Sequence, residues 1–390
     1  MIIKKVSMNL ITESVMNKFV ELFEYEPTLI VRSPGRVNII GEHLDYNDGF
    51  VLPAAIDKAI YVSVSKRADN NIHLYSVDFK EAYEVAVSEI KPTKFWSTYI
   101  LGVADQLIKG GHAIGGFNLV LDGDIPIGAG LSSSAAVECA TVFALNELFN
   151  LGIDKMEMVR IAQRAEHAFS GVMCGIMDMF ASMFGKKNHV IQLDCRSLAY
   201  EYKPFVLDGC KIVLLNTNVK HSLSSSAYNE RRQQCEQGVA WVKEHHPTVN
   251  TLRDVTMQML EEYIAPKDAI VYSRCKYVVE EIQRLLNGCK DLETGNIAGL
   301  GKKMYATHEG LSKLYEVSCK EADFLVNAVK NNPAVLGARM MGGGFGGCTI
   351  NIVKEEAITE MVETVSEKYK AAMGLELSVY IFQKLILPFR

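Results

Sequence analysis

Segments with strand patterns and segments with helix patterns are grouped along this chain, and their order limits the possible fold more than any other feature. Alternation of apolar and polar residues, which is typical of half-buried strands, predicts three early strands. A long Ala-, Leu- and Glu-rich stretch and two helical stretches after it predict three helices. The strands are expected at 60–64, 83–87 and 117–121, and the helices at 134–149, 155–169 and 176–184.

The second half of the chain repeats this grouping. A strand pattern at 211–215 is followed by charged amphipathic helices over roughly 227–330. Two late strands are expected near 349–353 and 379–382. Strands in groups followed by helices in groups favour an α+β fold over a doubly wound sheet.

The length of the chain predicts two domains. Its 390 residues exceed the size at which a single hydrophobic core stops growing. The helices of the first half have ended by residues 200–208, and we place the division there. We expect an N-terminal domain at 1–205 and a C-terminal domain at 206–390.

Composition and charge exclude several classes of protein. Hydrophobic residues make up 48% of the chain and charged residues 22%, which is typical of a folded globular protein. A net charge of -5 without a long Lys/Arg run argues against nucleic acid or an anionic membrane as the main partner. No segment approaches the roughly 20 apolar residues that span a bilayer. The first residues lack the apolar run of a signal peptide.

The cysteines give information about the compartment. Nine of them lie scattered without a C-x-x-C pair. An odd and unclustered count fits reduced thiols better than a disulfide framework or a zinc site. We therefore expect a cytoplasmic protein. We also expect its partners to be small molecules, and we favour a monomer over an oligomer.

The segment Gly35–Tyr46 concentrates side chains that can hold a polyol. Arg36, Glu42, His43 and Asp45 lie within ten positions, interrupted by apolar residues and a glycine. A hydroxyl-rich ligand needs several fixed donors and acceptors in a shaped pocket, which this mixture can supply. A salt-bridge cluster at a strand end is the alternative interpretation, since ion-pair networks are common.

A Gly- and Ser-rich loop at 126–136 indicates an anion-binding site. Gly128 and Gly130 allow close approach of the backbone, and three serines, at 132–134, precede a predicted helix. The exposed N–H groups and the dipole of a helix N-terminus attract phosphate. The loop does not end in the Gly-Lys-Ser/Thr of a P-loop, and it lacks the third glycine of a dinucleotide fingerprint. An ordinary Ser N-cap is the alternative.

A third glycine-rich loop covers 342–348. It formally matches G-x-G-x-x-G, but a strand pattern at 349–352 follows it where a dinucleotide site requires a helix. So many glycines are conformationally costly unless the backbone must approach something closely. A loop closing over a ligand and a tight hairpin are both consistent with this segment.

Together, these three motifs resemble those of the GHMP small-molecule kinases, and Gly35–Tyr46 resembles the galactokinase signature in particular. Segments 174–178 and 218–222, the latter leading to 228–232, are also similar to that family. The resemblance runs from about residue 14 to the C-terminus. The chain departs from the usual pattern at Met179, where Gln is common, and at Leu44, where Thr is common.

The resemblance implies a fold and a reaction. It implies an S5-like α/β N-terminal domain and a ferredoxin-like C-terminal domain, with the active site in the cleft between them. It also implies ATP-dependent phosphorylation of the C1 hydroxyl of α-D-galactose, with ATP as co-substrate and Mg²⁺ as the metal.

The resemblance also implies roles for individual residues. Asp178 and Arg36 would flank the reacting hydroxyl, and Ser134 and Glu166 would coordinate magnesium. The sugar would be bound by Glu42, His43, Leu44, Asp45, Gly175 and Tyr228. The nucleotide would be bound by Ser76, Gly128, Ala129, Gly130, Leu131, Ser132, Ser133 and Ser134.

Physical chemistry is consistent with these roles. Magnesium needs few protein oxygens because it retains waters and takes further ligands from phosphate, so a hydroxyl and a carboxylate suffice. An Arg beside the transferred group can stabilise its charge. Taken alone, Glu166 reads as a solvated helix residue. Asp178, by contrast, is an acid inside an apolar run, which already favours a functional role.

Three other functions fit parts of this pattern. An N-acetylgalactosamine kinase or an arabinose kinase of the same superfamily is the nearest alternative, although Glu42 and His43 suit the free 6-hydroxyl of a hexose. A non-catalytic sensor of galactose and ATP is the second, but such sensors lose residues from the serine loop, which is complete here at 132–136. A nicotinamide oxidoreductase is excluded because neither glycine loop has the required context.

Overall fold

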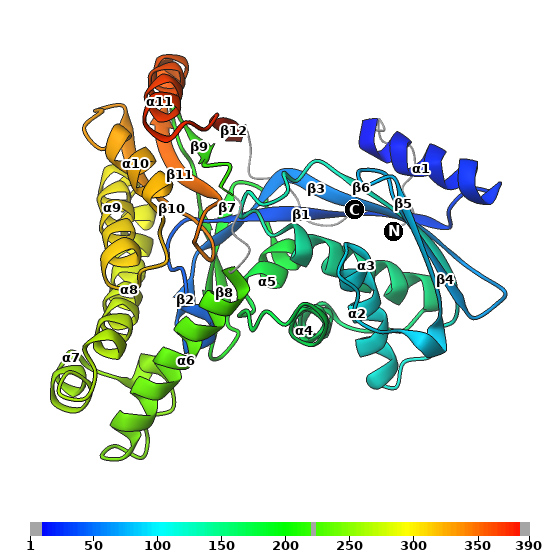
Figure 1. Ribbon diagram of the computed structural model, residues 1–390, viewed down its shortest axis with the longest axis horizontal. Coiled ribbons are helices and arrows are strands. Elements are labelled where there is room, and N and C mark those ends of the chain that lie inside the picture. Colours follow the sequence, from blue (N-terminus) through cyan, green and yellow to red (C-terminus); the bar gives the residue numbers. More distant parts are fainter. Residues whose placement is uncertain (1–9, 220–223, 383–390) are drawn as a thin grey trace.

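A five-stranded mixed sheet forms the centre of the N-terminal half in this computed structural model, which describes residues 10–219 and 224–382 (Figure 1). The strands in spatial order are β1 (Leu29–Asn38), β3 (Pro53–Lys66), β6 (Phe117–Gly123), β4 (Asn71–Ser76) and β5 (Glu81–Ala86). β4 and β6 run parallel, and the other neighbours are antiparallel. The three predicted early strands fall within β3, β5 and β6, except that Val87 lies just beyond β5.

Helices cover both faces of this sheet. α1 packs against β3 and β6 on one face, and α3 packs against β1 and β3 on the other (Figure 1). α3 is buried around most of its circumference because α2, α4 and α5 cover the sides that the sheet leaves open. The helices are α1 (Leu10–Phe23), α2 (Ser97–Lys109), α3 (Ser133–Phe149), α4 (Lys155–Ala165) and α5 (Met177–Phe184).

One predicted helix is wrong in its second part. The helix expected at 155–169 ends as α4 at Ala165, and Glu166–Ser170 form a π-helical turn. The Ser170 hydroxyl donates to both the backbone carbonyl and the side chain of Glu166 across this turn, at 2.7 Å each. Widened turns of this kind occur frequently at functional sites.

The C-terminal half contains a four-stranded antiparallel sheet. Its spatial order is β10-β11-β9-β12, with helices between β9 and β10 and between β11 and β12, which is the ferredoxin-like arrangement. The strands are β9 (Cys210–Asn216), β10 (Val335–Met340), β11 (Cys348–Lys354) and β12 (Ser378–Phe382). The helices are α6 (Ser224–Lys243), α7 (Met257–Met259), α8 (Ala269–Glu293), α9 (Ile297–Lys313), α10 (Lys320–Val329) and α11 (Ile358–Met373).

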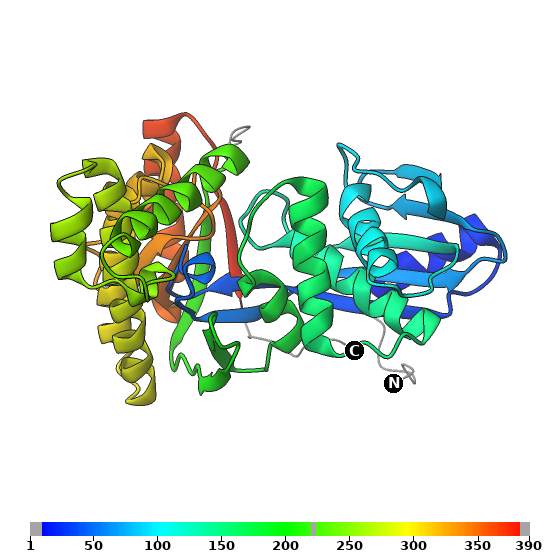
Figure 2. The ribbon, with the colours of Figure 1, turned by 90° about the horizontal axis from the view of Figure 1, so that it is seen from below.

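A small three-stranded sheet lies between the two larger ones. It contains β2 (Phe50–Val51), β7 (His189–Asp194) and β8 (Tyr200–Pro204), and β2 and β8 contact α8. The division predicted between 205 and 206 falls between β8 and β9. The α+β fold with two sheet-and-helix halves is confirmed, and Figure 2 shows the halves side by side with β1 reaching from one toward the other.

Burial joins the two halves into one body. A single hydrophobic cluster includes Val37 from β1, Leu214 from β9 and Leu300 from α9. No helix among residues 10–219 and 224–382 is both long and apolar enough to cross a membrane. The nine cysteines, all within the described residues, are free thiols.

Arg339 of β10 connects the halves through polar contacts inside this core. Its side chain is 0% exposed. It donates to the carbonyl oxygens of Asn38 and Ile39, and its Nη1 lies 2.8 Å from Glu42 Oε1. A buried guanidinium needs such a set of acceptors, because an unpaired buried charge is very costly.

Replacing Arg339 with Met should therefore destabilise the protein strongly. The variant removes the buried positive charge beside the Glu42 carboxylate and the donor of the Asn38, Ile39 and Met340 carbonyls, so the free energy of unfolding should fall by about 3–5 kcal/mol. Urea denaturation followed by circular dichroism measures this change. Arg164→Met is the control, since that side chain is 45% exposed and pairs with Glu157 at the surface. Equal losses for the two variants would contradict the role assigned to Arg339.

Candidate active site

A cavity of about 350 Å³ lies where the three motifs meet. Its walls come from both halves of the chain: the loop after β1, the N-terminus of α3, the start of α5, α6 and the loop between β10 and β11. The lining residues are Arg36, Glu42, His43, Asp45, Gly128, Gly130, Ser134, Ala135, Glu166, Val172, Cys174, Met177, Asp178, Met179, Tyr228, Gly342, Gly343 and Gly344.

An ion pair between Arg36 and Asp178 lies in this cavity. Arg36 Nε and Nη2 donate to the two carboxylate oxygens of Asp178, each at 2.8 Å. The Ser132 hydroxyl also donates to Asp178 Oδ2, and Arg36 Nη1 donates to the Gly130 carbonyl at 2.6 Å. The pairing of β1 with β3 shifts register between Pro34 and Arg36, and such irregularities often direct a side chain toward a site. Oδ1 accepts a single one of these bonds, so it retains an acceptor position.

The serine loop borders the cavity, and Ser132 is not an ordinary helix cap. Ser132 is the residue before α3, and it has a left-handed backbone with φ of 58°. Its side chain makes no capping hydrogen bond to the helix and donates to Asp178 instead. Ser134 and Ala135 in the first turn of α3 line the cavity. The backbone N–H groups of that turn therefore face a space in which an anion can bind.

Glu42 is buried in the cavity wall. Its Oε1 lies against Arg339 and accepts from the Gly342 backbone N–H at 3.1 Å, while Oε2 accepts from the Asn38 amide at 2.7 Å. Burial raises the pKa of Glu42, and the charge of Arg339 opposes that shift. Glu42 therefore joins the loop after β1 to the glycine-rich loop as well as facing the cavity.

His43 is buried and neutral. Burial lowers the pKa of His43 to about 3. Its Nδ1 lies 2.7 Å from the Tyr46 hydroxyl. Its buried Nε2 has no hydrogen bond of ordinary geometry within the described chain, although the Gly343 backbone lies close enough to affect the pKa of the ring. The ring of Tyr228 packs against His43 with centroids 5.2 Å apart.

Asp45 and Gly175, both predicted to bind the sugar, are in close contact with each other. A Cβ atom on Gly175 would lie 2.1 Å from the Asp45 carboxyl group, so this position requires glycine. The Tyr46 N–H donates to Asp45 Oδ1 at 3.1 Å. Burial, together with the nearby Asp178 charge, raises the pKa of Asp45 to about 6. A sugar hydroxyl is the kind of group that would satisfy this carboxyl.

The glycine-rich loop lies at the turn between two strands and at the cavity wall. It connects antiparallel β10 and β11, so it is a hairpin loop, and three of its glycines line the cavity. Gly344 has φ of 91°, and a Cβ there would lie 2.1 Å from the Val317 carbonyl. Glycine is therefore required at 344 for backbone conformation and for space.

Glu166 and Glu138 bring two carboxyl groups together beside Ser134. Glu166 Oε1 accepts from Ser170, whereas Glu166 Oε2 and both oxygens of Glu138 are buried and lack a hydrogen bond of ordinary geometry to any described group. Burial raises the pKa of both residues, and each lies close enough to affect the other. Glu166 is thus buried at 6% exposure and is not the solvated helix residue that its sequence context alone suggests.

Some residues predicted for the site do not face the cavity. Leu44 is fully buried in the core, and Ser76 at the end of β4 accepts a hydrogen bond from the Phe79 N–H. Ala129, Leu131, Ser132, Ser133 and Gly175 also lie outside the lining. Of the segments quoted for the family resemblance, Lys220, His221 and Ser222 lie outside the described residues.

Several residues that support the site were not predicted. Tyr315 is buried behind His43, and Arg339 holds Glu42 from the C-terminal half. No sequence pattern connects either residue to the first motif. Glu138 did leave a signal, because it is a carboxylate one turn after Ser134 in a helix that the sequence already predicted to be buried.

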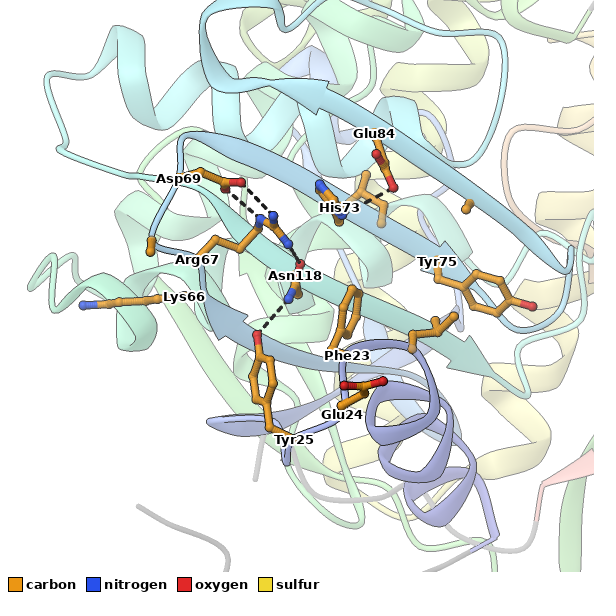
Figure 3. A pocket seen from close by; sticks show the side chains of 14 residues that line it. Phe23, Glu24, Tyr25, Lys66, Arg67, Asp69, His73, Tyr75, Glu84 and Asn118 are labelled. Atoms are coloured by element: carbon orange, nitrogen blue, oxygen red, sulfur yellow. Dashed lines mark hydrogen bonds and ion pairs between the residues drawn. The ribbon is translucent and has the colours of Figure 1, made fainter.

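A second hollow, of about 660 Å³, lies on the N-terminal sheet beside the end of α1 (Figure 3). Six of its polar side chains pair with one another. Arg67 bonds to Asp69 and Asn118, Asn118 donates to Tyr25, and His73 lies 3.4 Å from Glu84. None of the three motifs contributes to its lining. We therefore assign the chemistry to the smaller cavity.

The raised pKa of Asp45 makes a prediction about stability. A carboxyl whose pKa is about 6 when folded and 3.8 when unfolded binds its proton more tightly in the folded state. The free energy of unfolding should therefore fall as pH rises from about 4 to 6, by at most about 3 kcal/mol. Asp45→Asn should remove that decrease, as urea titrations across this pH range would show.

Asp69→Asn is the matched control for that experiment. Arg67 lowers the pKa of the exposed Asp69, so this carboxylate stabilises the folded state once it is ionised. At pH values where Asp69 is ionised, Asp69→Asn should therefore lower the free energy of unfolding, whereas Asp45→Asn should not. A parallel pH dependence for the parent protein and Asp45→Asn would contradict the assignment.

Family models match the chain on both sides of the cavity. The galactokinase galactose-binding signature matches residues 17–66, and the N-terminal and C-terminal domains of GHMP kinases match 98–186 and 289–371. The galactokinase of Thermotoga maritima is 42% identical over 347 residues, covering 89% of this chain and 95% of that protein. The galactokinase of Clostridium beijerinckii is 42% identical over 369 residues, covering 93% and 95%.

Solved structures agree with these matches. The crystal structure of Lactococcus lactis galactokinase complexed with galactose aligns with a TM-score of 0.92 at 33% identity, over 97% of this chain and 99% of that one. The Methanococcus jannaschii mevalonate kinase aligns at 0.64 with 19% identity over 92% and 98%, which shows a common fold alone. These matches cover most of the chain and agree with the three motifs at the cavity. The chain therefore belongs to the galactokinase family of the GHMP kinases.

Proposed function

We propose that this protein transfers the γ-phosphoryl group of ATP to the C1 hydroxyl of α-D-galactose, giving galactose 1-phosphate and ADP. The observation that carries the proposal is the Arg36–Asp178 pair, which lies between the galactokinase signature loop and the serine loop. In this proposal the reacting groups would lie next to both the sugar site and the phosphate site. The relative of known structure that binds galactose is 33% identical.

In this proposal Asp178 positions the hydroxyl and accepts its proton. Its carboxylate accepts three hydrogen bonds from Arg36 and Ser132, and Oδ1 accepts a single one of them, which leaves it a position for the hydroxyl. Phosphoryl transfer depends mostly on positioning and charge stabilisation, and the proton can leave late. Arg36 would stabilise the charge on the transferred group, since its guanidinium is held rigidly by Asp178 and the Gly130 carbonyl.

The sugar would lie against the first motif. Asp45, His43 and Glu42 would provide acceptors and donors for its hydroxyls, and the ring of Tyr228 would cover an apolar face. Gly175 contributes by leaving room for Asp45. The phosphates of ATP would bind at the loop 128–134, with Ser76 and the remaining loop residues shaping the nucleotide site from outside the cavity lining.

The residues beside the serine loop fit a magnesium ion. Glu166 Oε2 is a buried carboxylate oxygen without a hydrogen bond among the described residues, and the Ser134 hydroxyl lies near it. No cluster of three or more potential metal ligands exists in the described part of the chain. Magnesium needs no such cluster when phosphate oxygens and waters complete its shell. Ser134 and Glu166 would hold the ion, which neutralises phosphate charge when bound.

Two alternatives are less well supported. The match of the galactose-binding signature to residues 17–66 favours galactose over N-acetylgalactosamine or arabinose. A non-catalytic sensor is disfavoured because the serine loop is complete and Ser132 contacts Asp178. We further propose that the protein acts in the cytoplasm on small molecules and is a monomer.

A panel of sugars with ATP and magnesium tests the function directly. ADP release should be fastest with galactose, and phosphorus NMR should locate the new phosphate on C1. Release of ADP with N-acetylgalactosamine but not with galactose would replace the proposal with the alternative kinase. Binding of galactose and ATP without ADP release would support the sensor.

Asp178→Asn tests the mechanism. The substitution keeps the shape but removes the proton acceptor, so kcat should fall by about 10²–10⁴-fold. Galactose and ATP should bind almost as before, because the lost interaction is made chiefly in the transition state. Arg36→Met should lower kcat by about 10²–10³-fold. Because the two residues act together, the double variant should lose far less than the product of the single losses.

A folded Asp178→Asn protein with the parent kcat would show that this residue has no catalytic role. Steady-state kinetics should be paired with isothermal calorimetry of galactose binding. The calorimetry separates a loss of catalysis from a loss of binding.

Glu166→Gln tests the proposed magnesium site. The neutral amide is a weaker ligand for a hard cation, so the magnesium concentration for half-maximal rate should rise while galactose affinity stays nearly constant. Glu157→Gln is the control, since Glu157 lies in α4 and pairs with Arg164 at the surface. If the magnesium dependence of Glu166→Gln equals that of this control, Glu166 does not bind the metal.

A further inference from the structure

A buried chain of hydrogen bonds leads from His43 into the C-terminal half. The Tyr46 hydroxyl lies 2.7 Å from His43 Nδ1 and 2.7 Å from the Tyr315 hydroxyl. The Tyr315 hydroxyl in turn lies 3.2 Å from Cys235 Sγ. Tyr315 follows α9 and Cys235 lies in α6, so residues distant in sequence converge on one imidazole nitrogen. The other nitrogen, Nε2, belongs to a residue that lines the proposed sugar cavity.

The protons of this chain can be counted. Burial raises the pKa of Tyr46 and of Tyr315 well above the usual value and raises that of Cys235 to about 11, so all three keep their protons at neutral pH. Three hydrogen bonds join the four side chains, and the two hydroxyls and the thiol supply one proton for each bond. In one arrangement Cys235 donates to Tyr315, Tyr315 donates to Tyr46, and Tyr46 donates to His43. His43 Nδ1 is then an acceptor.

The opposite direction is chemically weaker. It would require the imidazole N–H to donate to a phenol oxygen. The thiol favours neither direction, because it is weak both as a donor and as an acceptor. A phenol is the stronger acid and an imidazole nitrogen the stronger base, so the Tyr46 hydroxyl is the better donor.

We propose that Tyr46 and Tyr315 are positioning residues that hold His43 in the tautomer with its proton on Nε2, so that His43 donates to an oxygen of the sugar. The donation to sugar rests on the proposed function, whereas the tautomer does not. Packing supports a fixed ring, because Tyr315 and Tyr228 lie against His43 with centroids 4.9 and 5.2 Å away. Neutral histidine has one donor nitrogen, so its tautomer decides which hydroxyl orientation can be bound.

NMR spectroscopy can determine the tautomer of His43. Long-range ¹H–¹⁵N correlation spectra of the sugar-free protein at pH 7 distinguish a protonated from an unprotonated ring nitrogen, and a His43→Gln spectrum assigns the signals. The parent protein should show a protonated Nε2 and an unprotonated Nδ1. A protonated Nδ1 in the parent would overturn the proposal.

Variants then test the tyrosines. Tyr46→Phe removes the partner of Nδ1 while keeping the ring, so both tautomers should appear and the galactose Kd should rise about two- to tenfold, with kcat little changed. Tyr315→Phe should raise the Kd by a smaller factor, because Tyr46 can still donate. Tyr305→Phe is the matched control, since the Tyr305 hydroxyl is buried without a hydrogen-bond partner in the described chain and packs in the separate core beside α10 and α11.

These experiments separate the role of the tyrosines from the proposed function. If Tyr46→Phe leaves both the His43 tautomer and the galactose Kd unchanged, the tyrosines do not position His43, even if galactose is phosphorylated. If the parent protein does not bind galactose in calorimetry, the proposed function fails and the donation to sugar fails with it. The spectra then still decide whether the tyrosines set the tautomer.

Discussion

The buried Arg339 guanidinium is the interaction on which the site depends. It binds the carbonyls at the end of β1 and the Glu42 carboxylate, and so fixes the signature loop against the C-terminal sheet. The cavity exists because these two halves are held at this separation. A charge at 0% exposure is tolerated there because four oxygens of both halves, including the Met340 carbonyl, accept from it or pair with it.

The cavity combines an excess of carboxyl groups with few cations. Burial raises the pKa of the lining residues Glu42, Asp45 and Glu166 and that of Glu138 behind the lining, and among these Glu42 has a buried arginine beside it. Such a site is electrostatically incomplete by itself. Hydroxyl donors from a sugar and a divalent cation carried with phosphate are the ligands that would complete it. The lack of cations beside these buried carboxyl groups suits the proposed ligands. Burial with so few cations also raises the pKa of Asp45, on which the predicted pH dependence of stability rests.

Much of the fold and of the site could be predicted from local pattern. The alternation in β3 and the buried composition of α3 predict their elements, because each depends on neighbours a few residues away. The π-helical turn at Glu166–Ser170 was not predicted, since the pattern of apolar residues does not distinguish it from the α-helix that precedes it. Leu44 was named with its motif, yet the structure buries it, because adjacent residues in a loop can face opposite ways.

The sequence by itself determined the motifs, the α+β class and the chemical types of the groups at the site. Tertiary structure decided which of those groups meet. Arg36 and Asp178 are 142 residues apart, and their bidentate pairing results from the packing of α5 on β1. Likewise, Tyr46 meets Tyr315 across 269 residues. Local sequence carries no record of such distances, because they are set by how buried surfaces of separate elements pack together.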